Sequence, residues 1–395
     1  MTKNLRELEQ IQEKLEYQND WLKVFVAEVI SFDDAKSKEN LEDRMLELEN
    51  LVNTYGGVVI LKHIQKRWNP DYNTYIWWWR LEEIMQEMQE SWAQLLILWN
   101  ILKPHQIYKI NEKLKTIWAK AWDRVDLILK IFEKNAKTEE SRLQIELASI
   151  KHMWPRIFDM WMELWSQWSW GSKLSRWKWE TNTEIMKRHL EKRILNIKKD
   201  LEHYKKVREV HRNARIKKWL NTVWIVWYTN AWKSSLMNVL TWKWVLSENK
   251  LFATLWTSVW KMTLFNEFDE KNPEYKKPTE ILINDTIWFI RDLPPNLIEA
   301  FASTLEDSIE SDILLHVVDS SDPKIEEKIK VVDDILENIK ANQKKIYVFN
   351  KIDLLTEEKI KELSNTFQHF KPLFISSHMW IWIDFLKEII KNELL

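Results

Sequence analysis

The sequence predicts an α/β protein with a small N-terminal α/β domain, an antiparallel helical hairpin and a doubly wound C-terminal α/β domain. After Leu220, five apolar runs rich in β-branched residues alternate with helical or loop segments, which is typical of a parallel sheet. In the middle of the chain, two long helical segments flank a polar loop. The length of 395 residues suits two or three domains.

The glycine content does not fit such a fold. The chain has 3 Gly and 27 Trp, whereas ordinary usage of about 7% predicts roughly 28 Gly. Glycine lets the backbone adopt positive φ or approach a ligand closely. We therefore interpret many of the tryptophans as glycine positions, as would result if UGA codons that specify glycine were translated as tryptophan.

The remaining composition excludes several classes of protein. The formal net charge is −1, so any basic surface must be local. The absence of cysteine excludes disulfides and thiolate metal sites, and no His, Asp and Glu spacing indicates a zinc site. The N-terminus is charged and no apolar run approaches 18 residues, so we expect no signal peptide, no transmembrane segment and a cytoplasmic location.

The N-terminal part contains an extension and the small α/β domain. Residues 1–50 are rich in Leu and Glu and predict helix, and residues 1–45 form an extension to which the sequence assigns no role. The domain over residues 46–112 follows. Its predicted strands are Val58–Gln65 and the run ESWAQLLILWN, which lie on either side of the helical run RLEEIMQEMQE.

Residues 113–218 predict the helical hairpin. A flexible loop over residues 161–181 separates its two helical segments, because the aromatic residues there follow neither helical nor strand periodicity. From Lys187 to Lys218 there are thirteen Lys or Arg against four Asp or Glu. Two interpretations of this charge stay open: a solvated helix face, and a contact with a polyanion such as RNA.

Residues 219–395 begin with a phosphate-binding signature between a predicted strand and a predicted helix. With glycine at 227 and 232 it reads GYTNAGKS, the P-loop pattern G-x-x-x-x-G-K-S/T, whereas literal indoles there would fill the phosphate site. Lys233 is expected to reach the β- and γ-phosphates and Ser234 to bind Mg²⁺. The nucleotide-contacting residues are Trp227, Tyr228, Thr229, Asn230, Ala231, Trp232, Lys233 and Ser234.

Three further motifs follow, each at the end of a predicted strand. They are Asp285, Thr286, Ile287 and Trp288, which read D-x-x-G with glycine at 288; Asn350, Lys351, Ile352 and Asp353, which read N-K-x-D; and Ser376, Ser377 and His378. Asp285 would hold Mg²⁺ through water, and the 288 N–H would contact the γ-phosphate. The Asp353 carboxylate can accept two hydrogen bonds that guanine offers and adenine does not. The ordered motifs predict a P-loop GTPase domain that binds GTP and Mg²⁺.

Each of these residues also has an ordinary structural interpretation. Asp285 alone could be a turn acid, and the NKID run could be a surface turn, but their joint order disfavours both. His316 lies inside the apolar run DILLHVVD, so we expect a core histidine rather than a catalyst.

The motifs resemble those of the HflX family of ribosome-associated GTPases. The runs that carry the resemblance in the C-terminal domain are WYTNAWKSSLMNVLT, LFATL, NDTIWFIRDLPPNLIEAFASTLEDSIESDILLHVVDSSDP and FNKIDLL. Upstream, NPDYNTYIWWWRLEEI, SRLQIELASIKHMWPRIFDMW and LSRWKWETNTEIMKRHLEKRI are similar to other segments of the family. The similarity covers residues 45–395.

The resemblance implies further site residues. It places glycine at Trp77, Trp79, Trp161, Trp168, Trp177, Trp179, Trp227, Trp232, Trp242 and Trp288. It adds to the nucleotide site the switch run Phe252, Ala253, Thr254, Leu255 and Trp256. Thr254 would complete the Mg²⁺ shell and would act in hydrolysis with Lys233, Asp285 and position 288. The sequence departs from the family at Trp154, at Trp256 and in the TSVWK run after it, and we expect no small C-terminal domain.

The resemblance also implies an activity and a partner. Phe289 stands where many GTPases have a water-orienting Gln, so intrinsic GTP hydrolysis should be slow. The implied partner is the large ribosomal subunit with its RNA, which would stimulate hydrolysis, and the implied task is to split or rescue stalled ribosomes under stress. We expect a monomer.

Two other functions stay open. If the tryptophans are literal, the chain is a nucleotide-free RNA-binding or scaffold protein with a degenerate GTPase fold. A GTPase of transfer-RNA modification or iron transport is disfavoured by the upstream resemblance and by the lack of membrane spans. The codons at positions 227, 232 and 288 discriminate between the first alternative and a GTPase.

Overall fold

A computed structural model describes residues 22–32, 38–136, 138–152, 173–217, 221–228, 233–241, 258–264, 279–285, 297 and 311–394. The chain forms two compact units. One contains Met1–Lys134 and Lys151–Arg188, and the other contains Asn135–Ile150 and His189–Leu395.

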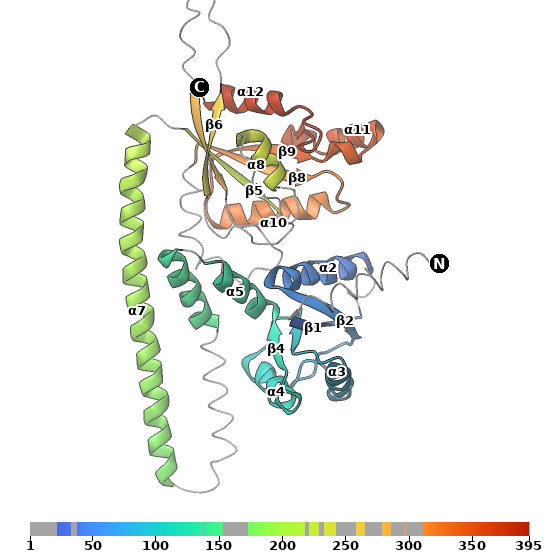
Figure 1. Ribbon diagram of the computed structural model, residues 1–395, viewed down its shortest axis with the longest axis vertical. Helices are drawn as coiled ribbons and strands as arrows, with labels where there is room; N and C mark the ends of the chain where they lie inside the picture. Colours follow the sequence, from blue (N-terminus) through green and yellow to red (C-terminus); the bar gives the residue numbers. More distant parts are fainter. Residues whose placement is uncertain are drawn as a thin grey trace, which may run out of the picture. The chain divides into compact units, whose positions relative to one another are not determined.

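The first unit contains a four-stranded parallel sheet in the order β2-β1-β3-β4 (Figure 1). The strands are β1 (Leu22–Ile30), β2 (Gly57–Lys66), β3 (Leu95–Leu98) and β4 (Lys120–Asp123). The intervening helices are α2 (Lys38–Tyr55), α3 (Trp78–Glu90) and α4 (Pro104–Leu114), the last followed by the short 3-10 helix η2 (Lys115–Ile117), and α5 (Arg124–Asn135) follows β4. This arrangement confirms the predicted small α/β domain.

Two sequence expectations for this unit were wrong. Residues 1–50 were expected to be helical, but Leu22–Ile30 forms β1, which pairs with β2 and β3 and has seven consecutive buried residues. A central parallel strand is covered on both faces, so its apolar run is continuous and lacks the alternation that marks a half-exposed strand. The segment after residue 112 was expected to be helical, yet Lys120–Asp123 forms β4 and extends the sheet.

One buried cluster of the first unit lies between the sheet and two helices. Phe25, Leu96 and Leu98 of the strands pack in one buried cluster with residues of α3 and α4. The helical members of the cluster are Leu81, Ile84, Met88, Ile107, Ile110 and Leu114. Each such side chain stabilises the fold by about 1.5–3 kcal/mol on burial.

The helical hairpin consists of a helix over residues 139–152 and the helix α7 (Lys173–Lys217). Two ion pairs in the second unit set their relative direction: Glu146 with Arg193, at 2.6 Å, and Glu140 with Arg208. The earlier acidic residue pairs with the later basic residue, so the helices are antiparallel, as the sequence predicted.

The second unit contains a six-stranded sheet in the order β10-β9-β8-β5-β7-β6 (Figure 1). Its strands are β5 (Asn221–Trp227), β6 (Ser258–Leu264), β7 (Thr279–Asp285), β8 (Ile313–Asp319), β9 (Lys344–Asn350) and β10 (Leu373–Phe374). Its helices are α8 (Lys233–Thr241), α10 (Ile325–Asn338), α11 (Glu357–Thr366) and α12 (Ile383–Leu394), with the 3-10 helices η3 (Ile352–Leu354) and η4 (Gln368–Phe370). All five predicted strands are present, and β6, which the sequence did not reveal, pairs antiparallel to β7.

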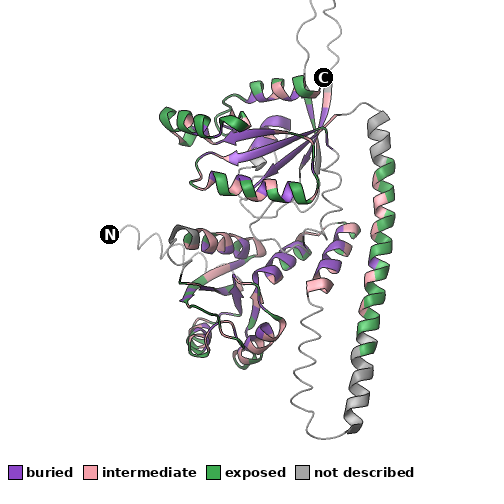
Figure 2. Cartoon of the chain, turned by 180° about the vertical axis from the view of Figure 1, so that it is seen from behind, coloured by how far each residue is buried: buried purple, intermediate pink, exposed green. Residues whose placement is uncertain are grey.

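Buried strands run through the centre of the second unit (Figure 2). Trp224, Val226 and Leu314 pack against Val332 and Leu336 of α10. The register pairs Ile225 with Asp285, Trp227 with Val317 and Asp319 with Asn350. The carboxyl ends of β5, β7, β8 and β9 therefore lie at one edge of the sheet, where α/β folds of this kind bind ligands.

Candidate nucleotide-binding site

The most completely described part of the site is the loop that would hold a base. Asn350 ends β9 and is fully buried, and its side-chain oxygen accepts a hydrogen bond from the Ser377 N–H at 2.9 Å. Its amide nitrogen donates to the Ser377 hydroxyl at 3.0 Å. The Ser376 hydroxyl donates to the Asp353 carboxylate at 2.5 Å. The structure thus brings together the N-K-x-D run and the Ser376–His378 run, which are separated by more than twenty residues.

Hydrogen bonds within the last motif hold the exposed His378 at the turn of this loop. Ser376 and Ile381 exchange two backbone hydrogen bonds, at 3.0 and 3.2 Å, and the Ser376 hydroxyl also accepts from the Met379 N–H at 3.0 Å. Trp380 and Trp382, which flank Ile381, have positive φ. The Ser376 hydroxyl therefore links the Asp353 carboxylate to the backbone of its own loop.

Lys351 has a left-handed backbone and a side chain that reaches the neighbouring strand. Its φ is 70°, and its ammonium group forms an ion pair with Asp319 at the end of β8. The other Asp319 oxygen accepts from the Ser321 N–H at 3.0 Å and from the Ser321 hydroxyl at 2.6 Å. Asp319 is not among the residues predicted from the sequence, although its place at the end of an apolar strand was a usable signal.

The phosphate side of the predicted site is described only in part. Trp227 is the buried last residue of β5, Tyr228 follows it, and α8 begins at Lys233. A strand, a short loop and a helix N-terminus therefore follow one another, as in phosphate-binding loops. Thr229, Asn230, Ala231 and Trp232 lie outside the described residues, and only the backbone is described for Lys233 and Ser234.

The predicted Mg²⁺ and switch residues lie at β7 or beyond it. Asp285 is the last residue of β7, and its backbone pairs with Ile225 of β5. The switch run Phe252, Ala253, Thr254, Leu255 and Trp256 lies outside the described residues, as do Thr286, Ile287, Trp288 and Phe289. Their roles stay predictions.

His316 is a buried residue of β8, 1% exposed, as expected for a core histidine. Its ring lies 5.0 Å from that of Tyr347, and its Nδ1 lies 3.9 Å from Asp333 of α10. Burial lowers the pKa of His316 to about 4, despite the opposing charge of Asp333. Burial and the hydrogen bond to Asp333 raise the pKa of the Tyr347 hydroxyl far above its usual range. These groups support the sheet beneath the site and do not line the base loop.

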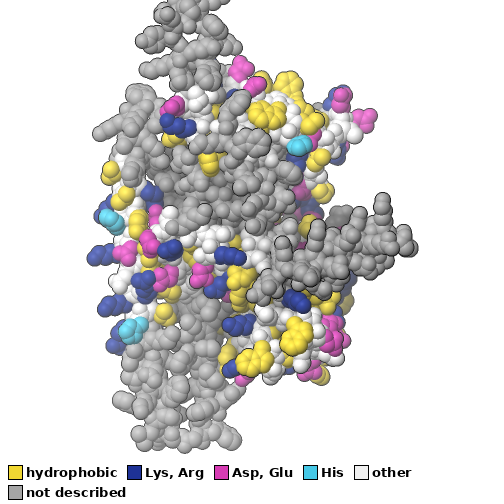
Figure 3. Space-filling model, in the orientation of Figure 1, with side chains coloured by type: hydrophobic (Ala, Val, Ile, Leu, Met, Phe, Trp, Pro, Cys, Tyr) yellow, Lys and Arg dark blue, Asp and Glu magenta, His cyan; other side chains and the backbone are white. Residues whose placement is uncertain are grey.

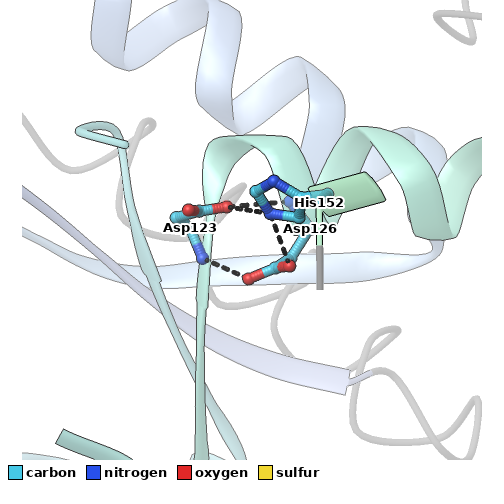
Figure 4. Close-up of side chains that lie close together, drawn as sticks. All are labelled: Asp123, Asp126 and His152. Atoms are coloured by element: carbon cyan, nitrogen blue, oxygen red, sulfur yellow. Dashed lines mark hydrogen bonds and ion pairs between the residues drawn. The ribbon is translucent and has the colours of Figure 1, made fainter. Parts of the chain in front are cut away.

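A second polar cluster lies in the first unit (Figure 4). Asp123 and Asp126 form a reciprocal cap on α5: the Asp126 N–H donates to Asp123 at 2.9 Å, and the Asp123 N–H donates to Asp126 at 3.0 Å. The His152 Nε2 lies 3.1 Å from Asp126 and 3.6 Å from Asp123. The second Asp123 oxygen accepts from the Leu102 N–H at 3.3 Å. Each carboxylate oxygen already has a partner within the protein, so the cluster is a helix cap held by a histidine.

Lys and Arg side chains follow the described part of α7 (Figure 3). Their exposed members include Lys187, Arg188, Lys192, Lys198, Lys199 and Lys206. Among the described residues, the structure contains no helix with the length and apolar character needed to cross a membrane.

Three family profiles match consecutive parts of the chain. They are described as GTP-binding GTPase N-terminal over residues 42–133, GTP-binding GTPase Middle Region over residues 135–215 and 50S ribosome-binding GTPase over residues 222–351.

Individual proteins match most of the chain. GTPase HflX of Caldanaerobacter subterraneus subsp. tengcongensis is 37% identical over 354 residues, which cover 89% of this chain and 77% of that protein. GTPase HflX of Methanocaldococcus jannaschii is 34% identical over 367 residues, which cover 91% and 84%. The crystal structure of SsGBP in complex with GDP covers 94% of this chain and 98% of its own, with a TM-score of 0.53 and 24% identity, which supports the fold alone.

Proposed function

The chain belongs to the HflX family of GTPases, and from that premise we propose that it is a cytoplasmic, monomeric switch that binds the large ribosomal subunit and splits or rescues stalled ribosomes under stress. The GTP-bound state would bind the subunit and its RNA. Contact with the subunit would stimulate an intrinsically slow hydrolysis. The profile described as a 50S ribosome-binding GTPase, which matches residues 222–351, supports the choice of partner.

The observation that carries the nucleotide specificity is the geometry of the base loop. Ser376 donates a hydrogen bond to one oxygen of the Asp353 carboxylate, and this bond restrains the group that would bind the base. Guanine offers its N1–H and its exocyclic amine to a carboxylate, whereas adenine offers no such pair. The buried pairing of Asn350 with Ser377 keeps the two runs at a constant separation.

The residues at the phosphate edge suit a Mg²⁺ ion. Ser234 lies in the first turn of α8 and Asp285 ends β7, which is the neighbour of β5 in the sheet. Hydroxyl and carboxylate oxygens are the ligands that Mg²⁺ prefers. When bound, the ion would neutralise charge that develops on the phosphates. Lys233 would contact the phosphates, and Thr254 would complete the ligand shell of the Mg²⁺ ion.

The proposal is tested by co-sedimentation of the full chain with large ribosomal subunits. The chain should carry glycine at 227, 232 and 288, because literal indoles would occupy the phosphate site. We expect the protein to sediment with the large subunit when GTP is present and to remain largely in the supernatant when GDP is present. The subunit should also accelerate phosphate release from GTP. Equal pelleting in both nucleotides would contradict the switch.

The role of the α7 basic surface is tested with charge variants. We expect Lys198→Gln/Lys199→Gln to weaken subunit binding and to reduce the salt dependence of binding, since each phosphate contact contributes about −0.9 to the log–log slope on duplexes. The matched control is Lys330→Gln/Lys361→Gln, which removes two exposed lysines from α10 and α11. An equal loss in both variants would show that net charge rather than this helix determines binding.

A further inference from the structure

Four tryptophans occupy backbone positions that favour glycine. Trp92, Trp118, Trp380 and Trp382 have φ between 55° and 60°. In the described part of the chain eight residues other than glycine have positive φ, and half of them are Trp; the others are Tyr75, Lys340, Lys351 and Lys371. Bulky residues seldom adopt this conformation, because Cβ approaches the following carbonyl oxygen. None of the four is among the positions that the family resemblance assigned to glycine.

Two of the four tryptophans stand at the position where helices end in glycine. After α3, the Ala93 N–H donates to the Met88 carbonyl at 2.9 Å across the left-handed Trp92. After η2, the Ala119 N–H donates to the Leu114 carbonyl at 3.1 Å across Trp118. A hydrogen bond of this span defines the Schellman motif, whose left-handed residue is usually glycine.

Gly56 is a comparable position, directly after a helix and with positive φ, at which the sequence has glycine. It follows α2 with a φ of 103°, and its N–H donates to the Val52 carbonyl at 3.1 Å. The indoles at Trp92 and Trp118, in contrast, are 82% and 94% exposed, so little packing compensates for their backbone conformation. Trp99 behaves as a genuine core tryptophan, since it is 6% exposed and the Arg124 guanidinium lies 4.2 Å from its ring centre.

We propose that the residue incorporated in the cell at positions 92, 118, 380 and 382 is glycine, encoded by UGA. The backbone of the molecule supports this assignment without reference to any motif. Its consequence reaches the nucleotide site, because positions 380 and 382 flank Ile381, whose backbone pairs with Ser376. In a host that reads UGA as tryptophan, two indoles would enter the base loop.

Peptide masses of the protein from its native cells, together with the coding DNA, test this assignment. We expect TGA codons and glycine-containing peptides at all four positions. TGG codons or tryptophan-containing peptides there would overturn the proposal, whatever the state of the P-loop.

A stability measurement tests the physical reason. In the chain as written, we expect Trp92→Gly/Trp118→Gly to raise the melting temperature by roughly 2–4 °C per position. The matched control, Trp99→Gly, should lower it, because Trp99 is buried against Arg124. A decrease for the first variant as large as that for Trp99→Gly would contradict the argument.

A separate observation concerns Asp319, which belongs to none of the four nucleotide motifs. Its carboxylate pairs with Lys351 through one oxygen and with Ser321 through the other. The Ser320 N–H also donates to the Asn350 carbonyl at 2.9 Å, so the end of β8 is joined to the base loop twice. Both side chains of the ion pair are less than a fifth exposed, so water screens the pair only in part.

We infer that Asp319 is a positioning residue for nucleotide binding, an inference that rests on the proposed nucleotide site. Asp319 holds the ammonium of Lys351 while the Lys351 backbone turns through its left-handed conformation toward Asp353. Loss of the Asp319 carboxylate would remove this ion pair from the Lys351 ammonium. The loop that contains Lys351 and Asp353 would still fold, but it would be less ordered and would bind the base more weakly.

The test compares GDP dissociation rates in the chain with glycine at 227, 232 and 288. We expect Asp319→Asn to accelerate dissociation on the order of tenfold, since a charge-assisted hydrogen bond is weakened, and Asp319→Glu to restore part of the loss. Asp322→Asn is the matched control, because it breaks the ion pair with Lys328 at a similar exposure. With Lys351→Met already present, Asp319→Asn should add little. Unchanged dissociation in Asp319→Asn would overturn the inference, whereas failure of the unaltered chain to bind GDP would overturn the nucleotide site itself.

Discussion

At the scale of single residues, the proposed selectivity for guanine depends on the hydrogen bonds that fix a few side chains of the base loop. Asp353 lies in an exposed loop, and a free carboxylate there would rotate. Its hydrogen bond to Ser376 and the buried pairing of Asn350 with Ser377 restrict that rotation. The specificity for guanine is therefore expected to change when the hydrogen-bonding character of Asp353 changes.

We predict that Asp353→Asn weakens GTP binding by at least tenfold and improves binding of the xanthine nucleotide. The amide can donate to the xanthine oxygen that replaces the guanine amine, whereas it lacks one acceptor that guanine requires. Competition of GTP and XTP against a fluorescent nucleotide measures the change. Glu357→Gln, an exposed carboxyl change at the start of α11, is the control and should leave both affinities alone.

His316 makes the stability of the second unit depend on pH. Its folded pKa of about 4 lies below the unfolded value of 6.5, so the unfolded state binds more protons between these values. The contribution of the neutral ring is complete above pH 6.5 and is lost as the pH falls toward 4. At pH 5 this loss amounts to about 2 kcal/mol.

We predict that His316→Leu removes most of the decrease in unfolding free energy between pH 7 and pH 5. Denaturant unfolding at the two pH values, followed by the fluorescence of the C-terminal domain, gives the comparison. His203→Gln is the control, because His203 lies exposed on α7. A pH dependence that is unchanged in His316→Leu would assign the effect to other groups.

At the scale of elements, the helix starts determine which groups are available for ligands. The N-terminus of α8 follows β5 after a short loop, and the backbone N–H groups of a helix N-terminus are donors that suit a phosphate. The N-terminus of α5 is closed by Asp123 and Asp126 and has no such role.

We predict that the chain as written binds GTP poorly and that Trp227→Gly/Trp232→Gly restores binding by at least a hundredfold. We expect an indole at either position to fill the space in which backbone N–H groups would meet phosphate. Isothermal titration with GTP measures the effect. The control is Trp122→Gly, a substitution in β4 of the first unit, which should not restore GTP binding. Restored binding in this variant would show that a general effect on folding explains the result.

For the α5 start, we predict that Asp123→Ala lowers the unfolding free energy by about 2 kcal/mol, since it removes the cap and the bond to Leu102. Zn²⁺ should not raise the melting temperature of the unaltered chain, because the carboxylate oxygens near His152 already accept hydrogen bonds. A rise that disappears in His152→Ala would instead identify a metal site.

At the scale of the whole molecule, the order of strands in the sheets shows which residues share one edge, and hydrophobic periodicity alone does not show this. The five strands of the C-terminal domain were predicted because each is a short apolar run followed by polar residues. Strand β1 was missed because a strand buried on both faces shows no alternation. Strand β6 was missed because its run SVWKMTL mixes polar and apolar residues and contains no long apolar stretch. The register then places Asp285, Asp319 and Asn350 at the ends of strands that share one edge.

The sequence by itself determined the family, the order of the nucleotide motifs and the anomaly of tryptophan and glycine. Each nucleotide motif depends on residues close together in the chain, where spacing reflects local backbone geometry, and the anomaly is a property of composition alone. Only the tertiary structure revealed the Asp319–Lys351 pair, the His152 contact with the α5 cap and the left-handed tryptophans at 92 and 118. The two contacts depend on which strands and helices become neighbours, and the left-handed turns depend on how each helix ends against its core. Separations along the chain do not encode either property.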